Sequence, residues 1–353
     1  MGREKAVSRG PMASWMRDNE GVAVEDVRVC PLCGGAGEEL YPGLRDRLGD
    51  APGVWSFQRC PACRHIWLDP RPLPAEVAKL YREYYTHSAL EPRPPTPVGL
   101  AARRAVLAGL GYAVGGPRDL RVRSLLCLFP VLRESIEREL RFLRGPPRGT
   151  LLDAGCGDGS FLAEMRDLGW KVLGLEPDPI AAEIARRRGI DVIESPLVEG
   201  ALPEDAFDAV VLNHVIEHVS DPVRTFNRCR GILKRGGVLV AVTPNAEGRG
   251  HRRFGDAWFH LDPPRHLHLF TGKTLRDSAE RAGLRVTEIR TSAASADEAR
   301  RASRAIRATG RFRPPEAPAR TSLGDRAFRL AEWATIRVAP SAGEELLLFG
   351  TQA

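Results

Sequence analysis

Residues 151–160 (LLDAGCGDGS) constrain the fold of this chain more than any other stretch. An apolar run ends in Asp153, glycines follow at alternate positions (Gly155, Gly157 and Gly159), and an amphipathic segment comes next. This order predicts a strand, a tight turn and a helix. Because glycine lacks a Cβ, a small molecule can lie against the main chain at the helix N-terminus. The turn is therefore predicted to hold a ligand.

A second apolar run, residues 171–175, ends in Glu176. An acid about 20 residues beyond such a glycine turn can bind the two hydroxyls of a ribose, so the pair of motifs predicts a nucleoside ligand. The dinucleotide fingerprint is G-x-G-x-x-G, whereas residues 155–159 read G-x-G-x-G and follow an acid. A turn with a purely structural role is the alternative.

This pattern resembles motif I of the class I S-adenosylmethionine-dependent methyltransferases. The resemblance implies that Asp153 contacts the methionine end of the cofactor, that the glycine backbone lies under it, and that Glu176 takes the ribose. The candidate cofactor-binding residues are Asp153, Gly155, Cys156, Gly157, Glu176, Pro177 and Asn213.

The remaining core alternates between strands and helices. Apolar runs predict strands at 191–193, 207–212, 238–242, 284–289 and 344–350, and helical spacing predicts helices at 221–233 and 274–282. Asp221 is expected to cap the first of these helices, with Pro222 at its first position. The pattern predicts an α/β fold with a doubly wound sheet. The resemblance implies seven strands over residues 149–353, with the last two strands as an antiparallel edge, and an Arg- and Ala-rich helical insertion at about 292–341.

The N-terminal residues 1–26 are charged and lack an apolar signal core, so they are predicted to form a disordered lead-in. No uncharged apolar run reaches the roughly 18 residues that a membrane-spanning helix needs. We expect a cytoplasmic protein that is soluble or peripheral at the inner membrane surface.

Two C-x-x-C pairs predict a metal site in residues 27–90. Cys30, Cys33, Cys60 and Cys63 can place four thiolates tetrahedrally around one structural zinc ion, as in a zinc ribbon. A redox pair or disulfides are the alternatives. His65 lies too close to Cys63 in the sequence to replace a thiolate.

The charge of this module argues against nucleic acid as a partner. Between the two pairs, three arginines face four acids, which is a poor footprint for phosphates. The cysteine pairs, the segment 67–72 and the later Tyr81, Tyr84 and Tyr85 resemble bacterial methyltransferases with an N-terminal zinc module. Some of these are sugar C-methyltransferases, and others resemble ubiquinone-biosynthesis O-methyltransferases.

Residues 91–148 form a third compositional segment. A proline-rich break at 91–97 opens it, and residues 92–148 contain 11 arginines, no lysine and four acids, a net charge of +7. Periodic leucines among these arginines predict basic amphipathic helices. Such helices can lie on an anionic membrane or accept a lipid-linked substrate. The alternative is a helical cover packed on the catalytic core.

The chemistry is expected where the fourth core strand ends. His214, Glu217 and His218 follow that strand at the carboxyl edge of the sheet, where open α/β sheets bind ligands. On a helical turn, His214 and His218 would share a face, and one of them would be a general base. His266 and His268 lie in an aromatic and basic segment, residues 258–270, that suits a substrate lid. These five residues are the catalytic candidates.

A catalytic metal is an alternative role for the same residues. The order His214-x-x-Glu217-His218 with a later histidine resembles the Glu-x-x-Glu-His metal site of enzymes that methylate the ends of small RNAs. Here histidine stands in the place of the first glutamate.

Together the motifs predict a methyltransferase that acts on a small-molecule, carbohydrate or lipid-linked acceptor. The alternatives are a metal-assisted RNA-end 2'-O-methyltransferase and a non-enzymatic zinc-ribbon interaction module with a cofactor-sensing domain.

Overall fold

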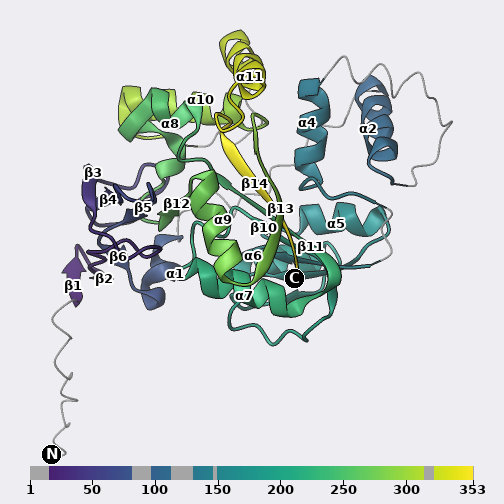
Figure 1. Ribbon diagram of the computed structural model, residues 1–353, viewed down its shortest axis with the longest axis horizontal. Helices are drawn as coiled ribbons and strands as arrows, with labels where there is room; N and C mark the ends of the chain where they lie inside the picture. Colours follow the sequence, from purple (N-terminus) through teal and green to yellow (C-terminus); the bar gives the residue numbers. More distant parts are fainter. Residues whose placement is uncertain (1–15, 82–96, 113–129, 146–148, 314–321, 353) are drawn as a thin grey trace, which may run out of the picture.

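The computed structural model describes residues 16–81, 97–112, 130–145, 149–313 and 322–352. A seven-stranded sheet forms its centre, in the order β9-β8-β7-β10-β11-β14-β13 (Figure 1). The strands are β7 (Thr150–Ala154), β8 (Lys171–Leu175), β9 (Val192–Ile193), β10 (Phe207–Asn213), β11 (Leu233–Pro244), β13 (Leu284–Ser292) and β14 (Glu345–Gln352). This confirms the predicted doubly wound fold. Only β14 runs antiparallel to its neighbours, so the expected antiparallel edge is one reversed strand between β11 and β13.

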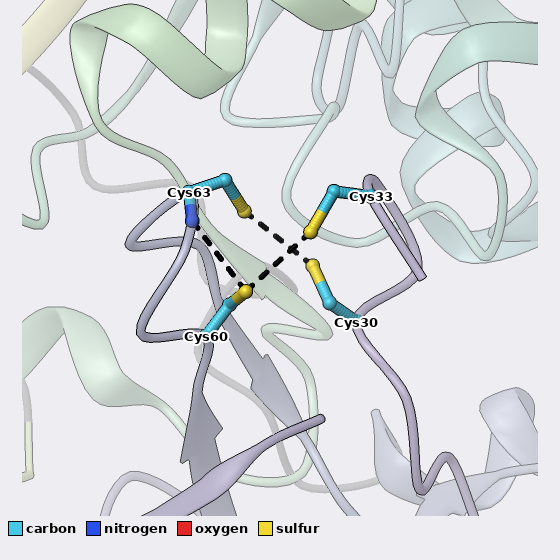
Figure 2. A group of neighbouring side chains, drawn as sticks. All are labelled: Cys30, Cys33, Cys60 and Cys63. Carbon is cyan, nitrogen blue, oxygen red and sulfur yellow. Dashed lines mark hydrogen bonds between the residues drawn. The ribbon is translucent and has the colours of Figure 1, made fainter. Parts of the chain in front are cut away.

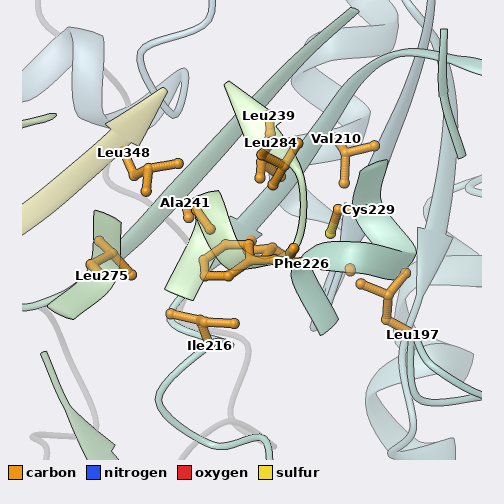
Figure 3. Close-up of a cluster of buried hydrophobic side chains, with 14 of the residues drawn as sticks. Leu197, Val210, Ile216, Phe226, Cys229, Leu239, Ala241, Leu275, Leu284 and Leu348 are labelled. Carbon is orange, nitrogen blue, oxygen red and sulfur yellow. The ribbon is translucent and has the colours of Figure 1, made fainter. Parts of the chain in front are cut away.

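Helices cover the sheet because its central strands are apolar on both faces. Residues 209–212 of β10 are all buried. The covering helices are α5 (Ser160–Asp167), α6 (Pro179–Arg187), α7 (Pro222–Ile232) and α9 (Gly272–Arg281). Figure 3 shows Phe226 and Cys229 of α7 in a cluster with Leu275 of α9 and residues of the sheet. The predicted cap of α7 is confirmed, since Asp221 accepts a hydrogen bond from the Arg224 backbone N–H at 2.9 Å.

The predicted disordered lead-in is wrong for residues 16–25. They form a hairpin of β1 (Met16–Asn19) and β2 (Val22–Glu25), and β2 also pairs with β6 (Arg71–Pro72). Val22 and Val24 alternate inward and are fully buried, which stabilises the hairpin against the rest of the molecule. Residues 1–15 lie outside the described residues.

The cysteine-rich module does not have a core of its own. Its sheet contains β3 (Glu38–Leu44), β4 (Trp55–Arg59) and β5 (Ile66–Leu68), and its fourth strand is β12 (His268–Leu269), which comes from the segment after β11. Trp55 and Phe57 are fully buried in one cluster with Trp258. The segment predicted as a substrate lid is therefore part of the shared core.

The remaining helices lie at the periphery of the sheet (Figure 1). They are η1 (Pro74–Glu76), α1 (Val77–Leu80), α2 (Pro97–Gly109), α4 (Pro130–Glu139), α8 (Arg249–Phe254), η3 (Gly255–Ala257), η4 (Phe259–Leu261), α10 (Ala296–Thr309) and α11 (Leu323–Ile336). Helices α2 and α4 fall in the predicted basic linker, and α10 and α11 fall in the predicted insertion. Parts of these segments lie outside the described residues, namely the proline-rich residues 91–96 and residues 113–129, 146–148 and 314–321. Within the described part of the chain, no helix combines the length and apolar character needed to cross a bilayer.

Candidate functional site

The four predicted metal-ligating cysteines converge beside the small sheet (Figure 2). The Cys30 and Cys63 Sγ atoms are 3.6 Å apart, and those of Cys33 and Cys60 are 3.4 Å apart. These separations exceed the roughly 2.05 Å of a disulfide bond, and all four thiols are free, so the disulfide alternative is wrong. Zn–S bonds of about 2.3 Å give tetrahedron edges of about 3.8 Å, so the donor set fits a zinc ion.

The two cysteine pairs sit on matching turns. The Cys30 backbone N–H donates to the Gly35 carbonyl at 2.8 Å, and the Cys60 N–H donates to the His65 carbonyl at 2.9 Å. The residue after each pair has a positive φ, +75° at Gly34 and +66° at Arg64. The matched turns explain how two separate segments present their thiols to one point.

The predicted ligand turn follows β7, between β7 and α5. Gly155, Gly157 and Gly159 have φ values of +78°, +55° and +73°, which favour glycine at all three positions. A Cβ on Gly155 would lie 2.7 Å from the Val215 side chain, whereas one on Gly157 would meet nothing within 4 Å. The turn is thus packed against the loop after β10 at Gly155 and open at Gly157.

Two acids flank this turn. The Glu176 carboxylate accepts hydrogen bonds from the Gly157 N–H at 2.8 Å and the Asp178 N–H at 2.9 Å. Asp153 is buried, and its Oδ1 has no hydrogen-bond partner among the described residues. Burial raises the pKa of Asp153 to about 7, although the Arg141 guanidinium opposes this shift. An unpaired buried carboxylate oxygen beside an open glycine turn suits a polar ligand.

The other predicted cofactor contacts, Cys156, Pro177 and Asn213, differ in orientation and exposure. The Cys156 thiol points at β8, because a Cβ on Gly174 would lie 2.5 Å from its Sγ, so only the Cys156 backbone faces the turn. Pro177 is exposed next to Glu176, and Asn213 is the half-buried last residue of β10.

The loop after β10 is not helical, contrary to our expectation. His214 has a φ of +54°, and residues 216–218 form a turn, so His214 and His218 do not share a face. His214 lies between two buried carboxylates, with Nδ1 3.0 Å from Glu217 Oε1 and Nε2 3.1 Å from Glu345 Oε1. Burial alone would lower the pKa of His214, but these hydrogen bonds raise it to about 9. A ring that is already protonated at neutral pH is not a general base.

His218 is the histidine of this loop that stays neutral. Burial, and then the nearby His266, lower the pKa of His218 to about 4. Its Nδ1 is 3.0 Å from the Arg265 carbonyl and 3.1 Å from the Tyr81 hydroxyl. A carbonyl only accepts hydrogen bonds, so Nδ1 carries the proton and Nε2 keeps a free lone pair.

His266 completes a group of three metal-type donors. Its Nδ1 is 2.8 Å from the His260 carbonyl, so by the same argument its Nε2 is an acceptor. Donor atoms of Glu217, His218 and His266 lie within 4.8 Å of one another. His214 is not part of this group, because its two nitrogens are engaged by Glu217 and Glu345.

The structure assigns His268 a different position from the one we expected. It belongs to β12, and its Nδ1 is 3.0 Å from Nε2 of the buried His65, which directly precedes the neighbouring strand β5. Burial and then Arg71 lower the pKa of His268 to about 4. Its catalytic role is therefore not supported, because it packs inside a strand pairing.

Comparison with known proteins finds a methyltransferase family model that covers the glycine turn. Residues 129–289 match the family described as a methyltransferase domain. The chain contains a class I S-adenosylmethionine-dependent methyltransferase domain. Its sheet order and the positions of the glycine turn and Glu176 are those implied by the resemblance.

Relatives of this methyltransferase domain include ubiquinone biosynthesis O-methyltransferases. That of Cereibacter sphaeroides is 32% identical over 146 residues, 38% of this chain and 59% of the relative. That of Caulobacter vibrioides is 38% identical over 113 residues, 29% of this chain and 44% of the relative. The chain thus matches less than two thirds of the length of each. The solved geranyl diphosphate C-methyltransferase of Streptomyces coelicolor is 17% identical with a TM-score of 0.43, covering 74% of this chain and all of that one.

Sequence reasoning missed several residues that surround the methyltransferase site. Tyr81 was noted only as part of an aromatic pattern, yet its hydroxyl contacts His218. Glu345 contacts Nε2 of His214, and Arg138 forms an ion pair with Glu345 at 2.9 Å. Two consecutive acids where the buried strand β14 begins, Glu344 and Glu345, were the available signal, because charges at such positions need buried partners.

Proposed function

We propose that the protein transfers a methyl group from S-adenosylmethionine to a hydroxyl or an acidic carbon of a small-molecule, carbohydrate or lipid-linked acceptor. The packing of Val215 on Gly155 carries the proposal. Val215 belongs to the loop that carries Glu217 and His218, and it packs on the predicted cofactor turn. A bound cofactor and a catalytic histidine would therefore be neighbours. Tyr81 lies within electrostatic range of both Glu176 and Glu217, which supports the same proximity.

The cofactor would lie over Gly155 and Gly157, with the Cys156 backbone below it. Glu176, held in place by the backbone N–H groups of Gly157 and Asp178, would take the ribose hydroxyls. The unpaired Oδ1 of Asp153 suits the ammonium group at the methionine end. Pro177 and Asn213 would border the adenosine and the methyl group. When bound, S-adenosylmethionine supplies a methyl group made electrophilic by a positively charged sulfur.

His218 would act as the general base. Its Nε2 would take the proton of the acceptor, while the Arg265 carbonyl fixes the ring through Nδ1. His214 would instead hold Glu217 in place through their hydrogen bond. Burial alone would raise the pKa of Glu217, but the hydrogen bond and charge of His214 lower it to about 2, so Glu217 stays ionised.

Label transfer tests this function. The enzyme and methyl-labelled S-adenosylmethionine would be incubated with cell extract, and new labelled molecules identified by untargeted mass spectrometry. The same assay with His218→Asn should lose about 10²–10⁴-fold in rate with nearly unchanged cofactor affinity. No labelled product in any extract, or a wild-type rate in the variant, would contradict the proposal.

A divalent cation on Glu217, His218 and His266 is the second candidate mechanism. The donor atoms of these three residues lie within 4.8 Å of one another, which favours it. It would connect the chain with the metal-assisted RNA-end reaction, in which the cation positions the acceptor oxygen. Loss of turnover on chelation, restored by Mg²⁺ or Mn²⁺ while the four-cysteine module stays folded, would support it. Turnover that is insensitive to chelator would support the base.

We propose zinc as the ion of the four cysteines and a structural role for it. The shared sheet supports this. Strand β5 follows the second cysteine pair in the sequence and pairs with β12, which comes just after His266. The zinc would thus stabilise the wall of the acceptor site instead of taking part in the reaction.

A further inference from the structure

Helix α11 has an inward face that is fixed to the molecule. Asp325, Phe328 and Glu332 are buried. Arg300 of α10 forms an ion pair with Asp325, and its guanidinium lies 5.8 Å from the centre of the Phe328 ring. The orientation of α11 is therefore set by packing against α10.

The outward face of α11 is apolar. Leu323 is 84% exposed and Leu330 is 56% exposed, and Val338, just beyond the helix, is 86% exposed. The seven-residue spacing of Leu323 and Leu330 brings their side chains to one side of the helix, and Val338 follows in the turn after it. Ala327, Ala331 and Ala334 lie between them and are also exposed. Such a continuous apolar stripe on a surface helix indicates an interaction surface.

The charges on this face have one sign. Both acids of α11, Asp325 and Glu332, are buried, so no acidic residue of Leu323–Ile336 is exposed. Arg326 and Arg337 are exposed beside the apolar stripe. The insertion 292–341 as a whole contains ten arginines, no lysine and five acids. The face combines apolar side chains with arginine, as surface-bound amphipathic helices do.

Neighbouring helices extend this face. Figure 1 shows α4 at the same end of the molecule as α11. The Ala293 N–H, at the start of the insertion, donates to Glu134 of α4 at 3.1 Å. Leu132 of α4 and Leu100 of α2 are 42% and 40% exposed. Of the nine large hydrophobic residues exposed in the described part of the chain, five therefore belong to α2, α4, α11 and the turn after it.

We propose that α11 docks on an anionic lipid bilayer, lying in the plane of its surface with the apolar stripe toward the acyl chains. Arginines beside the stripe would contact lipid phosphates. A second copy of the chain fits this face less well, because a symmetric contact would bring the same arginines together without acids between them. The exposed leucines of α4 and α2 would add to the contact. This docking is independent of the acceptor that the enzyme methylates.

Vesicle flotation tests the docking. The full chain would be mixed with vesicles of phosphatidylcholine alone or with phosphatidylglycerol added. We expect binding to the anionic vesicles, little binding to the neutral ones, and weakening at high salt. The double variant Leu330→Asp/Val338→Asp should bind at least about tenfold more weakly, because it removes apolar burial and adds repulsion. Arg326→Gln should bind more weakly by a smaller factor.

Ile180→Asp is the matched control. Ile180 lies on α6, outside this face, and is 54% exposed, so its replacement should leave vesicle binding unchanged. Circular dichroism would verify that all variants are folded. Equal binding of the double variant and the wild type, or no binding to anionic vesicles at low salt, would overturn the proposal. An α11 that instead forms a protein contact would show as a wild-type oligomer that the double variant disperses, without vesicle binding.

Discussion

Arg265, in the segment after β11, forms a buried ion pair with Asp46 of the cysteine-rich module. The Arg265 Nη1 atom is 2.9 Å from Asp46 Oδ2, and the two side chains are 0% and 2% exposed. Arg265 also pairs with Asp262 and donates to the Leu80 carbonyl. The pair therefore joins the two parts of the chain directly beside His266.

We predict that Asp46→Ala destabilises the whole protein by about 3–5 kcal/mol, because it leaves a buried guanidinium with one carboxylate fewer. Asp46 also accepts the backbone N–H groups of Leu48, Gly49 and Ala51, so its loss leaves three further polar groups without this acceptor. Urea unfolding measures the change. Asp50→Ala is the control: Asp50 is 44% exposed in its ion pairs with Arg311 and Arg313, and its loss should cost much less. Equal costs in the two variants would contradict the structural role of the pair.

The four-cysteine site gives a prediction about metal content. Wild-type protein should contain about one zinc ion per chain, and Cys60→Ser should contain far less, because the remaining three thiolates do not complete a tetrahedral site. Elemental analysis of the purified proteins measures this. Cys229→Ala on α7 should retain its zinc, since Cys229 is not one of the four clustered cysteines. Equal zinc in the wild type and Cys60→Ser would remove the assignment.

The ribose contact predicts a loss of cofactor affinity. Glu176→Ala should weaken S-adenosylmethionine binding by about 1.5–3 kcal/mol, because hydrogen bonds to a charged acceptor are lost. Calorimetry on the folded variant measures it. Glu183→Ala on α6 is the control, since Glu183 is exposed and forms an ion pair with its helix neighbour Arg187. Unchanged affinity in Glu176→Ala, or tight binding of NAD to the wild type, would count against the cofactor assignment.

The sequence predicted the central sheet because its evidence is local. Each signal acts within a few residues of the element that it defines. These signals are the glycine spacing, the cap Asp221 with Pro222 at the first helical position, and the apolar runs. The long-range contacts were not predictable in this way. Asp46 and Arg265 are 219 positions apart, and nothing in the pattern around either residue indicates the other. The same holds for β12, because a two-residue strand has no period of its own.

The structure brings together only some of the residues of the predicted histidine cluster. His214, Glu217 and His218 were expected to meet a later histidine; the structure brings Glu217, His218 and His266 together and leaves His214 out of this group. The expected helical face failed because His214 takes a left-handed backbone conformation, which turns its side chain toward Glu345. Glu345 lies on a strand 131 positions away, so the protonation of His214 was decided by a partner that local patterns do not show.

The last prediction concerns pH and the buried Glu332 of α11. Burial, and then the charge of Glu344, raise the pKa of Glu332 to about 9, while Arg249 opposes this and Glu134 adds to it. The folded chain therefore keeps a proton on Glu332 between about pH 4.5 and 9, where the unfolded chain has released it. The free energy of unfolding should fall as pH rises through this range. Burial raises the pKa of Glu344 to about 7, which adds to the fall up to that pH.

Glu332→Gln keeps the shape of the protonated side chain without an ionisable group. The variant should therefore gain stability relative to the wild type as pH rises from 5 to 9, and the difference between them should be smallest near pH 5. Urea unfolding at pH 5.5 and 8.5 compares the two. Glu183→Gln on the exposed face of α6 is the control and should differ from the wild type by the same amount at both pH values. A constant difference for Glu332→Gln as well would mean that Glu332 is ionised in the folded state, and that a cation or water compensates its charge.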